Sequence, residues 1–231
     1  MIELYAVRID AMLSDTQQEQ IVRYECISEE RRERIKRVKN PQQKKKEVLC
    51  ELLLRYALYQ AYGTKQESIV FDVNPYGKPH IKNLASFHFN LSHAGVWILC
   101  GIDDSPIGVD IEWIQPIDFC IAEQLFSPEE KAVLYSAAEA EQIPLFYRFW
   151  TLKESYLKAL GTGLSNPLSL FTMNLFENEG AELHTEEGGS GWFFKTYQFD
   201  PSYFVSVCAR HPMFPVQLKV LEVKELLYEI T

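Results

Sequence analysis

The chain has 231 residues, of which 47% are hydrophobic and 13% aromatic, so a folded core is expected and extensive disorder is excluded. Its net charge of −9 argues against non-specific nucleic-acid binding by the whole molecule. No stretch approaches the roughly 20 apolar residues of a membrane helix, so no membrane association is expected. Five cysteines lie far apart in the chain, which favours reduced thiols and a cytoplasmic protein over a disulfide framework or a zinc site.

The first half of the chain predicts a mixture of helices and strands. Capping signals and the helical spacing of apolar residues predict three helices, over residues 14–26, 28–39 and 42–62. Ser14 and Gln17 form a capping-box pattern in the first of them, and Gly63 ends the third. Period-two alternation predicts strands over residues 2–9, 68–73, 87–91 and 96–102. The Pro- and Gly-containing segment 74–79 predicts a turn.

Residues 31–46 form a basic segment within this acidic protein. They contain nine Lys or Arg residues and a single acid, Glu33. A local basic patch suits a compact polyanion better than a long polymer. A solvated helix face is the alternative explanation for the same run.

The second half opens with a predicted strand around Asp110. The run Ser127-Pro128-Glu129-Glu130 predicts a helix start with a capping box. Pro144 is expected to open the next helix, which carries Glu154 and Lys158 and ends at Gly161 or Gly163. Four strands are then expected, over residues 170–176, 192–199, 203–209 and 216–223. The polar, Gly-rich residues 177–191 are expected to form a loop.

The two halves are similar in layout. Each has an N-terminal strand, helices that include a long one, and then about three antiparallel strands. This order predicts an α+β protein of two small lobes, residues 1–105 and residues 106–231, the latter with a C-terminal extension. A cleft between lobes is a common ligand site.

Four side chains predict a site for a metal and a phosphate ester. Asp110 and Glu112 are two residues apart, and residues at i and i+2 of a strand point to the same side. Glu154 and Lys158 are neighbours on one helix face. Mg²⁺ prefers carboxylate oxygens and keeps waters and substrate phosphate oxygens as its other ligands. A solvated strand edge and an ordinary Glu–Lys helix pair are the alternatives from spacing alone.

Two further segments carry polar groups that suit a phosphate. Ser92 and His93 end the run Phe89-Asn90-Leu91-Ser92-His93, where they would bind phosphate or activate a hydroxyl. A turn built by the same side chains is the alternative. Lys78, in the predicted turn 74–79, would meet a phosphate or face water.

Taken together, four motifs resemble the Sfp-type 4′-phosphopantetheinyl transferase family. They are Gly77-Lys78-Pro79, Phe89-Asn90-Leu91-Ser92-His93, Gly108-Val109-Asp110-Ile111-Glu112 and Trp150-Thr151-Leu152-Lys153-Glu154-Ser155-Tyr156-Leu157-Lys158. They occur in the family's order and at about its separations, and the resemblance covers nearly the whole chain. Each motif is modest alone, but the ordered set is specific.

The resemblance implies a fold and a reaction. The fold is α+β, with two similar lobes related by pseudo-twofold symmetry, each a small antiparallel sheet packed with helices. The reaction transfers the 4′-phosphopantetheine group from coenzyme A to a serine of an apo acyl or peptidyl carrier protein. Its products are the holo carrier protein and 3′,5′-ADP. Asp110, Glu112 and Glu154 would hold Mg²⁺ against the pyrophosphate.

The resemblance also assigns roles to individual residues. Asp110, Glu154 and Lys158 are the expected catalytic residues: Glu154 is a candidate base for the carrier serine, with a bound water as the alternative, and Lys158 can neutralise the leaving group. His93 matches a histidine at the 3′-phosphate. The residues expected to bind coenzyme A are Arg31, Arg34, Lys46, Tyr76, Gly77, Lys78, Pro79, Ser92, His93 and Lys158.

The basic helices depart from the family pattern. Arg31 and Arg34 stand where relatives often carry lysines, and Lys46 aligns with an arginine after a gap that leaves Lys45 as the alternative. Charge is kept, but bidentate geometry is not, because Arg and Lys present different donors. Residues 113–126 fall where family members meet the carrier protein. The protein is expected to act as a monomer.

Two other functions would use the same residues. A metal-dependent phosphodiesterase would place its acids around two ions roughly 3.5–4 Å apart, with Asp103 and Asp104 as added ligands. A non-catalytic carrier-binding protein would keep the fold and lose turnover. Transfer to a serine needs in-line positioning and charge stabilisation at the leaving phosphate. The predicted acids and Lys158 meet these needs without a cysteine or histidine nucleophile.

Overall fold

The structure is a computed structural model that describes residues 1–9, 29–63, 69–177, 179–185 and 191–230. The helix predicted over residues 14–26 therefore lies outside the described residues. The helices are α2 (Glu29–Arg37), α3 (Pro41–Tyr62), α4 (Cys120–Leu125), α5 (Pro128–Ser136), α6 (Glu139–Leu160) and α7 (Val223–Ile230). The strands are β1 (Glu3–Arg8), β2 (Phe71–Val73), β3 (Pro79–Ile81), β4 (His88–Ala94), β5 (Trp97–Asp103), β6 (Gly108–Trp113), β7 (Phe171–Leu175), β8 (Gly180–Thr185), β9 (Phe193–Tyr197), β10 (Tyr203–Ala209) and β11 (Lys219–Leu221).

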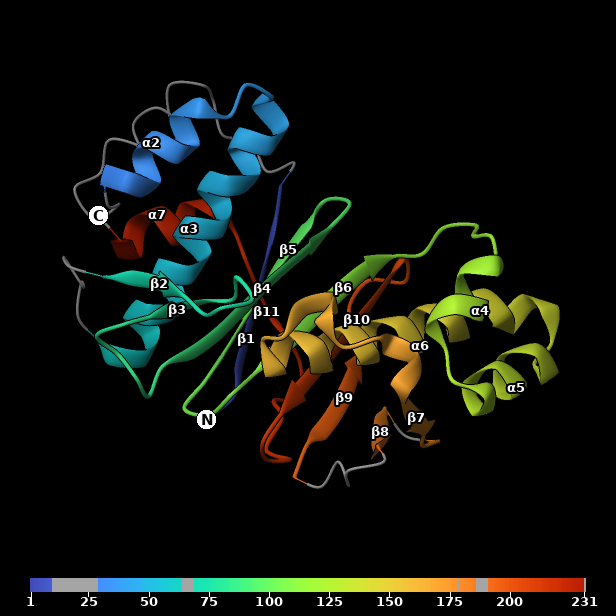
Figure 1. Cartoon of the computed structure of the whole chain (residues 1–231). Coiled ribbons are helices and arrows are strands. Elements are labelled where there is room, and N and C mark those ends of the chain that lie inside the picture. Colours follow the sequence, from blue (N-terminus) through green and yellow to red (C-terminus); the bar gives the residue numbers. More distant parts are fainter. Residues whose placement is uncertain (10–28, 64–68, 178, 186–190, 231) are drawn as a thin grey trace.

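The strands form two main sheets, which confirms the predicted α+β class. The first sheet has the order β11-β1-β5-β4, and the second has the order β6-β10-β9-β8-β7. We call the first sheet with α2, α3, α7 and the β2–β3 hairpin the first lobe, and the second sheet with α4, α5 and α6 the second lobe. Figure 1 shows α3 and α7 against the first sheet and α6 against the second.

The end of the chain returns to the first lobe. Strand β11 pairs with β1 in parallel, whereas the other pairs in both sheets are antiparallel. Val223 and Leu226 of α7 then join the apolar core beneath α3. The division at residue 105 stays a prediction, and the last strand and helix of the chain pack with residues before it.

Several local signals act as predicted. Gly63 ends α3 as predicted, and Asn40, which had not been predicted as a cap, accepts from the backbone N–H groups of residues 42 and 43 at the start of that helix. Ser127 and Glu130 form the predicted capping box of α5. These signals depend on bonds between neighbouring residues, so sequence alone reveals them.

Other local predictions were wrong. Pro144 lies inside α6, which begins at Glu139, so it removes one hydrogen bond within the helix and does not open it. Residues 177–191 were expected to be a loop, but they contain β8, which pairs with β7 and β9. Helices α4 and α7 and strand β3 had not been predicted.

The two sheets share an apolar core, and this packing positions the functional site. Leu4, Ala6 and Leu99 of the first sheet pack with Val109 and Val207 of the second. Alternate residues of β1 face the core of the first lobe, so this strand is buried on both sides. A Cβ on Gly101 of β5 would lie 2.5 Å from Cγ1 of Val109. The bare backbone of Gly101 therefore allows β5 and β6 to approach closely.

Among the helices in the described part of the chain, none has the length and apolar character of a membrane span.

Candidate active site between the two sheets

Ser92, Asp110 and Lys158 form a hydrogen-bonded triangle where the two lobes meet. The Lys158 ammonium donates to Oδ1 of Asp110 at 2.6 Å and to Oγ of Ser92 at 2.9 Å. The Ser92 hydroxyl also donates to Oδ1 of Asp110, at 3.0 Å. The three residues come from β4, β6 and α6. The structure therefore brings together residues that the sequence placed in three separate motifs.

A side chain of β4 holds this strand against β6. Oδ1 of Asn90 accepts from the backbone N–H of Val109 at 2.9 Å. The contact lies two residues before Ser92 on one strand and one residue before Asp110 on the other. It fixes the register at which Ser92 and Asp110 face each other.

Asp110 is a buried acid with one unused oxygen. Its side chain is 3% exposed, whereas that of Lys158 is 28% exposed. Burial raises the pKa of Asp110, although Lys158 and Ser92 act in the opposite direction. Among the described residues, its Oδ2 atom has no hydrogen-bond partner. A buried oxygen without a partner is costly, so this atom is available for a cation or a donor.

Glu112 and Glu154 add two more carboxyl groups near Asp110. Burial, with the Asp110 charge as the next cause, raises the pKa of Glu112 to about 6. Burial and the charge of Asp110 also raise the pKa of Glu154. The indole Nε1 of Trp150 donates to Oε1 of Glu112 at 3.1 Å. No role at the site was predicted for Trp150 from the sequence, so this bond to a site carboxylate was missed.

The donor set fits a divalent cation, although its oxygens do not converge in this structure. In the described part of the chain, the cluster of three donor atoms within 4.8 Å of one another is Asp103, Asp104 and His211, a separate group. Like charges repel, and Glu112 here accepts from Trp150 while Lys158 occupies one oxygen of Asp110. The charge of Asp110 reaches Glu112 and Glu154, and its Oδ2 atom is unused, so the three carboxyl groups offer oxygen ligands of the kind that a hard cation prefers.

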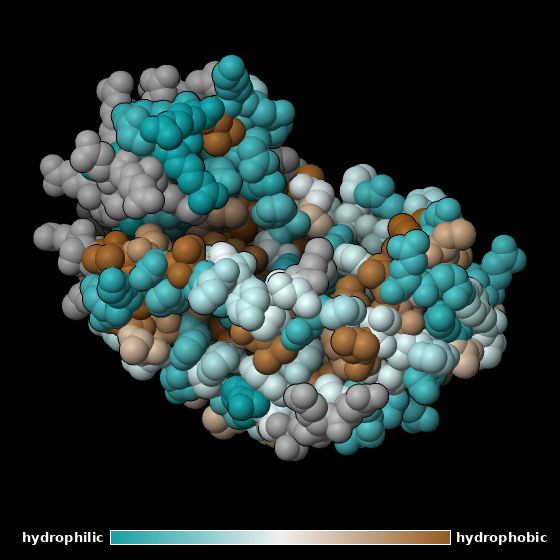
Figure 2. Space-filling view, viewed as in Figure 1, coloured by the Kyte–Doolittle hydropathy of each residue, from teal (hydrophilic) through white to brown (hydrophobic). Residues whose placement is uncertain are grey.

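His93 lies near this centre, within reach of the charges of Lys46 and Lys158. Burial lowers the pKa of His93, and the nearby charges of Lys46 and Lys158 lower it further. Arg34 forms an ion pair with Glu47 at 3.2 Å and is 61% exposed. The side chain of Arg31 lies outside the described residues. Figure 2 shows hydrophilic side chains gathered over α2, the helix that carries Arg34.

The turn that follows β2 makes contacts that the sequence did not indicate. Tyr76 is exposed, and Gly77 has a φ angle of 88°. Pro79 begins β3. Lys78 was expected to meet a phosphate or face water, but its ammonium donates to the carbonyl oxygens of Ile107 and Ala159. Its expected contact with a phosphate stays a prediction.

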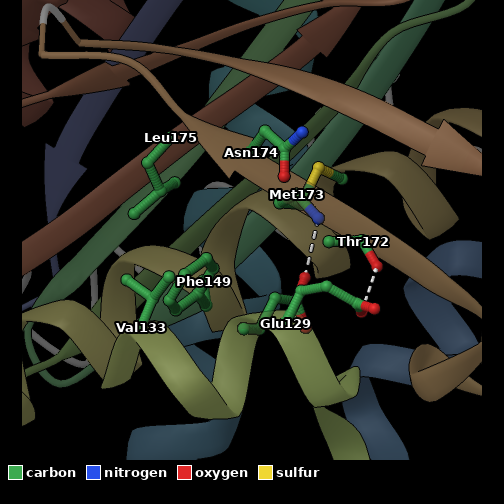
Figure 3. Close-up of a pocket in the computed structure, with 8 residues that line it drawn as sticks. Glu129, Val133, Phe149, Thr172, Met173, Asn174 and Leu175 are labelled. Atoms are coloured by element: carbon green, nitrogen blue, oxygen red, sulfur yellow. Dashed lines mark hydrogen bonds between the residues drawn. The ribbon is translucent and has the colours of Figure 1, made fainter. Parts of the chain in front are cut away.

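The pocket in Figure 3 lies away from these residues. It has a volume of about 250 Å³ and is lined by residues of α5, α6 and β7, including Val133, Phe149 and Leu175. Glu130 at this pocket accepts from the backbone N–H of Met173 at 2.7 Å and from the buried ammonium of Lys153. The bond from Lys153 to Glu130 holds α6 against α5 at the residue next to Glu154.

The segment 113–126 leaves β6 and forms α4 at the surface of the second lobe. Trp113 is 46% exposed and Ile121 is 44% exposed. Large apolar side chains at a surface are typical of interaction sites when they gather in one region.

Two family models match successive parts of the chain. The family model of the 4′-phosphopantetheinyl transferase superfamily matches residues 106–208, and that of the 4′-phosphopantetheinyl transferase N-terminal region matches residues 14–102. The chain is 36% identical over 225 residues to 4′-phosphopantetheinyl transferase Sfp of Bacillus subtilis (strain 168), covering 97% of this chain and 100% of the relative. It is 33% identical over 226 residues to 4′-phosphopantetheinyl transferase psf-1 of Bacillus pumilus, covering 97% of each. A solved holo-(acyl-carrier-protein) synthase from Bacillus anthracis in complex with CoA (3′,5′-ADP) has a TM-score of 0.38 and 17% identity, over 45% of this chain and 93% of that chain.

Proposed function

The chain belongs to the 4′-phosphopantetheinyl transferase superfamily, and we propose from this that it transfers the 4′-phosphopantetheine group of coenzyme A to a serine of an apo acyl or peptidyl carrier protein. The observation that carries the proposal is the meeting of Ser92, Asp110 and Lys158 at the junction of the lobes. The products are the holo carrier protein and 3′,5′-ADP.

The reaction forms one phosphorus–oxygen bond and breaks another. The serine oxygen bonds to the pyrophosphate phosphorus that bears pantetheine, and 3′,5′-ADP leaves with the electron pair of the broken bond. Lys158 supplies positive charge where negative charge grows on the leaving phosphate. Glu154, or a water bound beside it, accepts the serine proton as general base.

Asp110, Glu112 and Glu154 would hold Mg²⁺. When bound, the ion offsets the charge of the pyrophosphate. The unused Oδ2 atom of Asp110 and the closeness of the three carboxyl groups support this assignment. Lys158 holds the other oxygen of Asp110, so it orients that carboxylate as well as the leaving phosphate.

The nucleotide end of coenzyme A is assigned to the first lobe. His93 and Lys46 form the centre of the 3′-phosphate site, because they are close enough for the Lys46 charge to lower the pKa of His93. Arg31 and Arg34 add positive charge from α2. The turn Tyr76–Pro79 holds the adenine. Residues 1–105 thus serve the nucleotide, and residues 106–231 serve the metal and the chemistry.

The carrier protein is assigned to residues 113–126, where Trp113 and Ile121 are exposed. We place the enzyme in the cytoplasm as a monomer. Cys100, Cys120 and Cys208 are free thiols, which suits a reducing compartment.

The proposal is tested by incubating the protein with coenzyme A, Mg²⁺ and a panel of apo carrier domains. The mass of at least one carrier should rise by one phosphopantetheine. If no carrier gains mass while one of them binds tightly, the protein is a non-catalytic carrier-binding member of the family. If a generic phosphodiester is hydrolysed without any carrier, the protein is a phosphodiesterase.

A further inference from the structure

A second set of contacts joins the 74–79 turn of the first lobe to the second lobe. The ammonium of Lys78 donates to the carbonyl oxygen of Ile107 at 3.1 Å and to that of Ala159, in the last turn of α6, at 3.0 Å.

 Ile107 directly precedes β6, and Ala159 directly follows Lys158. One ammonium therefore connects the turn, the strand that carries Asp110 and the helix that carries Lys158.

Asn74 makes a parallel connection at the same place. Its Nδ2 atom donates to the carbonyl oxygen of Gly161 at 2.7 Å. Its Oδ1 atom accepts from the backbone N–H groups of Tyr76 and Lys78, at 3.0 and 2.8 Å. The same side chain thus folds the turn and attaches it to the end of α6.

These two side chains donate hydrogen bonds to backbone carbonyl groups at the C-terminal end of α6. The last four carbonyl groups of a helix have no partner within it. Lys78 occupies that of Ala159, and Asn74 occupies that of the capping residue Gly161. A positive charge at a helix C-terminus is also favourable. Burial lowers the pKa of Lys78 to about 8, which fits a side chain directed into the protein.

The side chains of the turn pack directly against the backbone of Gly161. It has a φ angle of 73°, and a Cβ at this position would lie 2.7 Å from Cδ of Lys78 and 2.9 Å from Nδ2 of Asn74. Gly63 ends α3 with a similar φ angle of 65°, but a Cβ there would meet no atom of the described residues within 4 Å. The two glycines thus differ in whether a segment packs against the helix end.

We propose that Lys78 and Asn74 are positioning residues that dock the Tyr76–Pro79 turn on the C-terminal end of α6. This docking fixes the position of the nucleotide-binding turn relative to Lys158. It assigns Lys78 to positioning in place of direct contact with a phosphate. The effect on catalysis rests on the proposed function, whereas the docking itself does not.

The docking is tested in the free protein by hydrogen exchange of the backbone amides of residues 76–78. Lys78→Met and Gly161→Ala should each speed this exchange about tenfold, the factor that corresponds to a loss of ~1.4 kcal/mol. Gly63→Ala, which carries the same backbone strain without the contact, should leave it unchanged, as should Lys82→Met. Unchanged exchange in Lys78→Met would overturn the proposal, because a residue that only contacts phosphate does nothing in the free protein.

The catalytic consequence is tested by the KM for coenzyme A. Lys78→Met and Gly161→Ala should each raise it about tenfold, and the double variant should be no worse than the stronger single one, since both changes disrupt the same docking. Additive effects would show that Lys78 acts separately from the docking and would overturn the proposal. If the wild-type protein transfers nothing, the proposed function fails, and the exchange measurement alone decides the docking.

Discussion

The ammonium of Lys158 lies 2.6 Å from Oδ1 of Asp110, although 48 residues separate the two in the chain. The contact joins the long helix α6 to the first strand of the second sheet, and Ser92 of the other sheet completes it. It places a cation, a buried carboxylate and a hydroxyl at one point between the lobes.

Replacing Asp110 by Asn should lower phosphopantetheine transfer by more than about 100-fold. Loss of a residue that only supports a metal ligand costs up to about 100-fold, and Asp110 would hold the metal itself. Asparagine keeps the shape of the side chain but removes the charge that pairs with Lys158. The measurement is the carrier mass shift over time, with circular dichroism to verify folding. Asp72→Asn, an exposed acid on β2, is the matched control. A folded Asp110→Asn variant with normal transfer would contradict the metal-binding role.

Replacing Trp150 by Phe should weaken Mg²⁺ binding by about 10- to 100-fold. Phenylalanine keeps an aromatic ring that can stack on Phe146 but loses the N–H that orients Glu112. Calorimetric titration with Mg²⁺ measures the affinity. Trp97→Phe removes a similar bond, from Nε1 to Oδ2 of Asp200 at 3.0 Å, away from the site. Equal Mg²⁺ affinities in the two variants would show that the bond to Glu112 has no part in metal binding.

The affinity for coenzyme A should fall as the pH rises from 6.5 to 8.5, by up to about tenfold. Burial and nearby lysines lower the pKa of His93 in the free protein, whereas a bound 3′-phosphate would raise it. Binding then takes up a proton, so it weakens as pH rises through the pKa of the bound state. His93→Gln should remove this dependence. An equal slope in both proteins, measured by calorimetry, would place the 3′-phosphate elsewhere.

Replacing Lys153 by Met should lower the free energy of unfolding by about 3–5 kcal/mol. The change leaves the buried carboxylate of Glu130 without its cation and frees the carbonyl of Phe171. Adding Glu130→Gln should recover part of the loss, because it removes the uncompensated charge. Urea unfolding gives the values. Lys131→Met breaks an ion pair with the exposed Glu123 at 3.3 Å and should cost less than about 1 kcal/mol. A similar cost for both lysines would contradict the importance of burial.

The sequence alone determined the features that depend on neighbouring residues. The capping box of Ser127 and Glu130, the end of α3 at Gly63 and the side-by-side placement of Asp110 and Glu112 follow from short-range bonds and from strand periodicity. The order of four motifs was also sufficient to indicate the family. These signals are local, so a single chain read from end to end contains them.

The tertiary structure decided which of these local features meet. Ser92 reaches Lys158 across 66 residues, and Asn74 reaches Gly161 across 87. Lys78 turns into the second lobe, and β11 returns to β1. Such contacts are set by how two sheets bury a shared apolar core, and the burial of apolar surface has no preferred sequence separation or direction. Spacing along the chain therefore supplied the residues of the site, and packing supplied their meeting point.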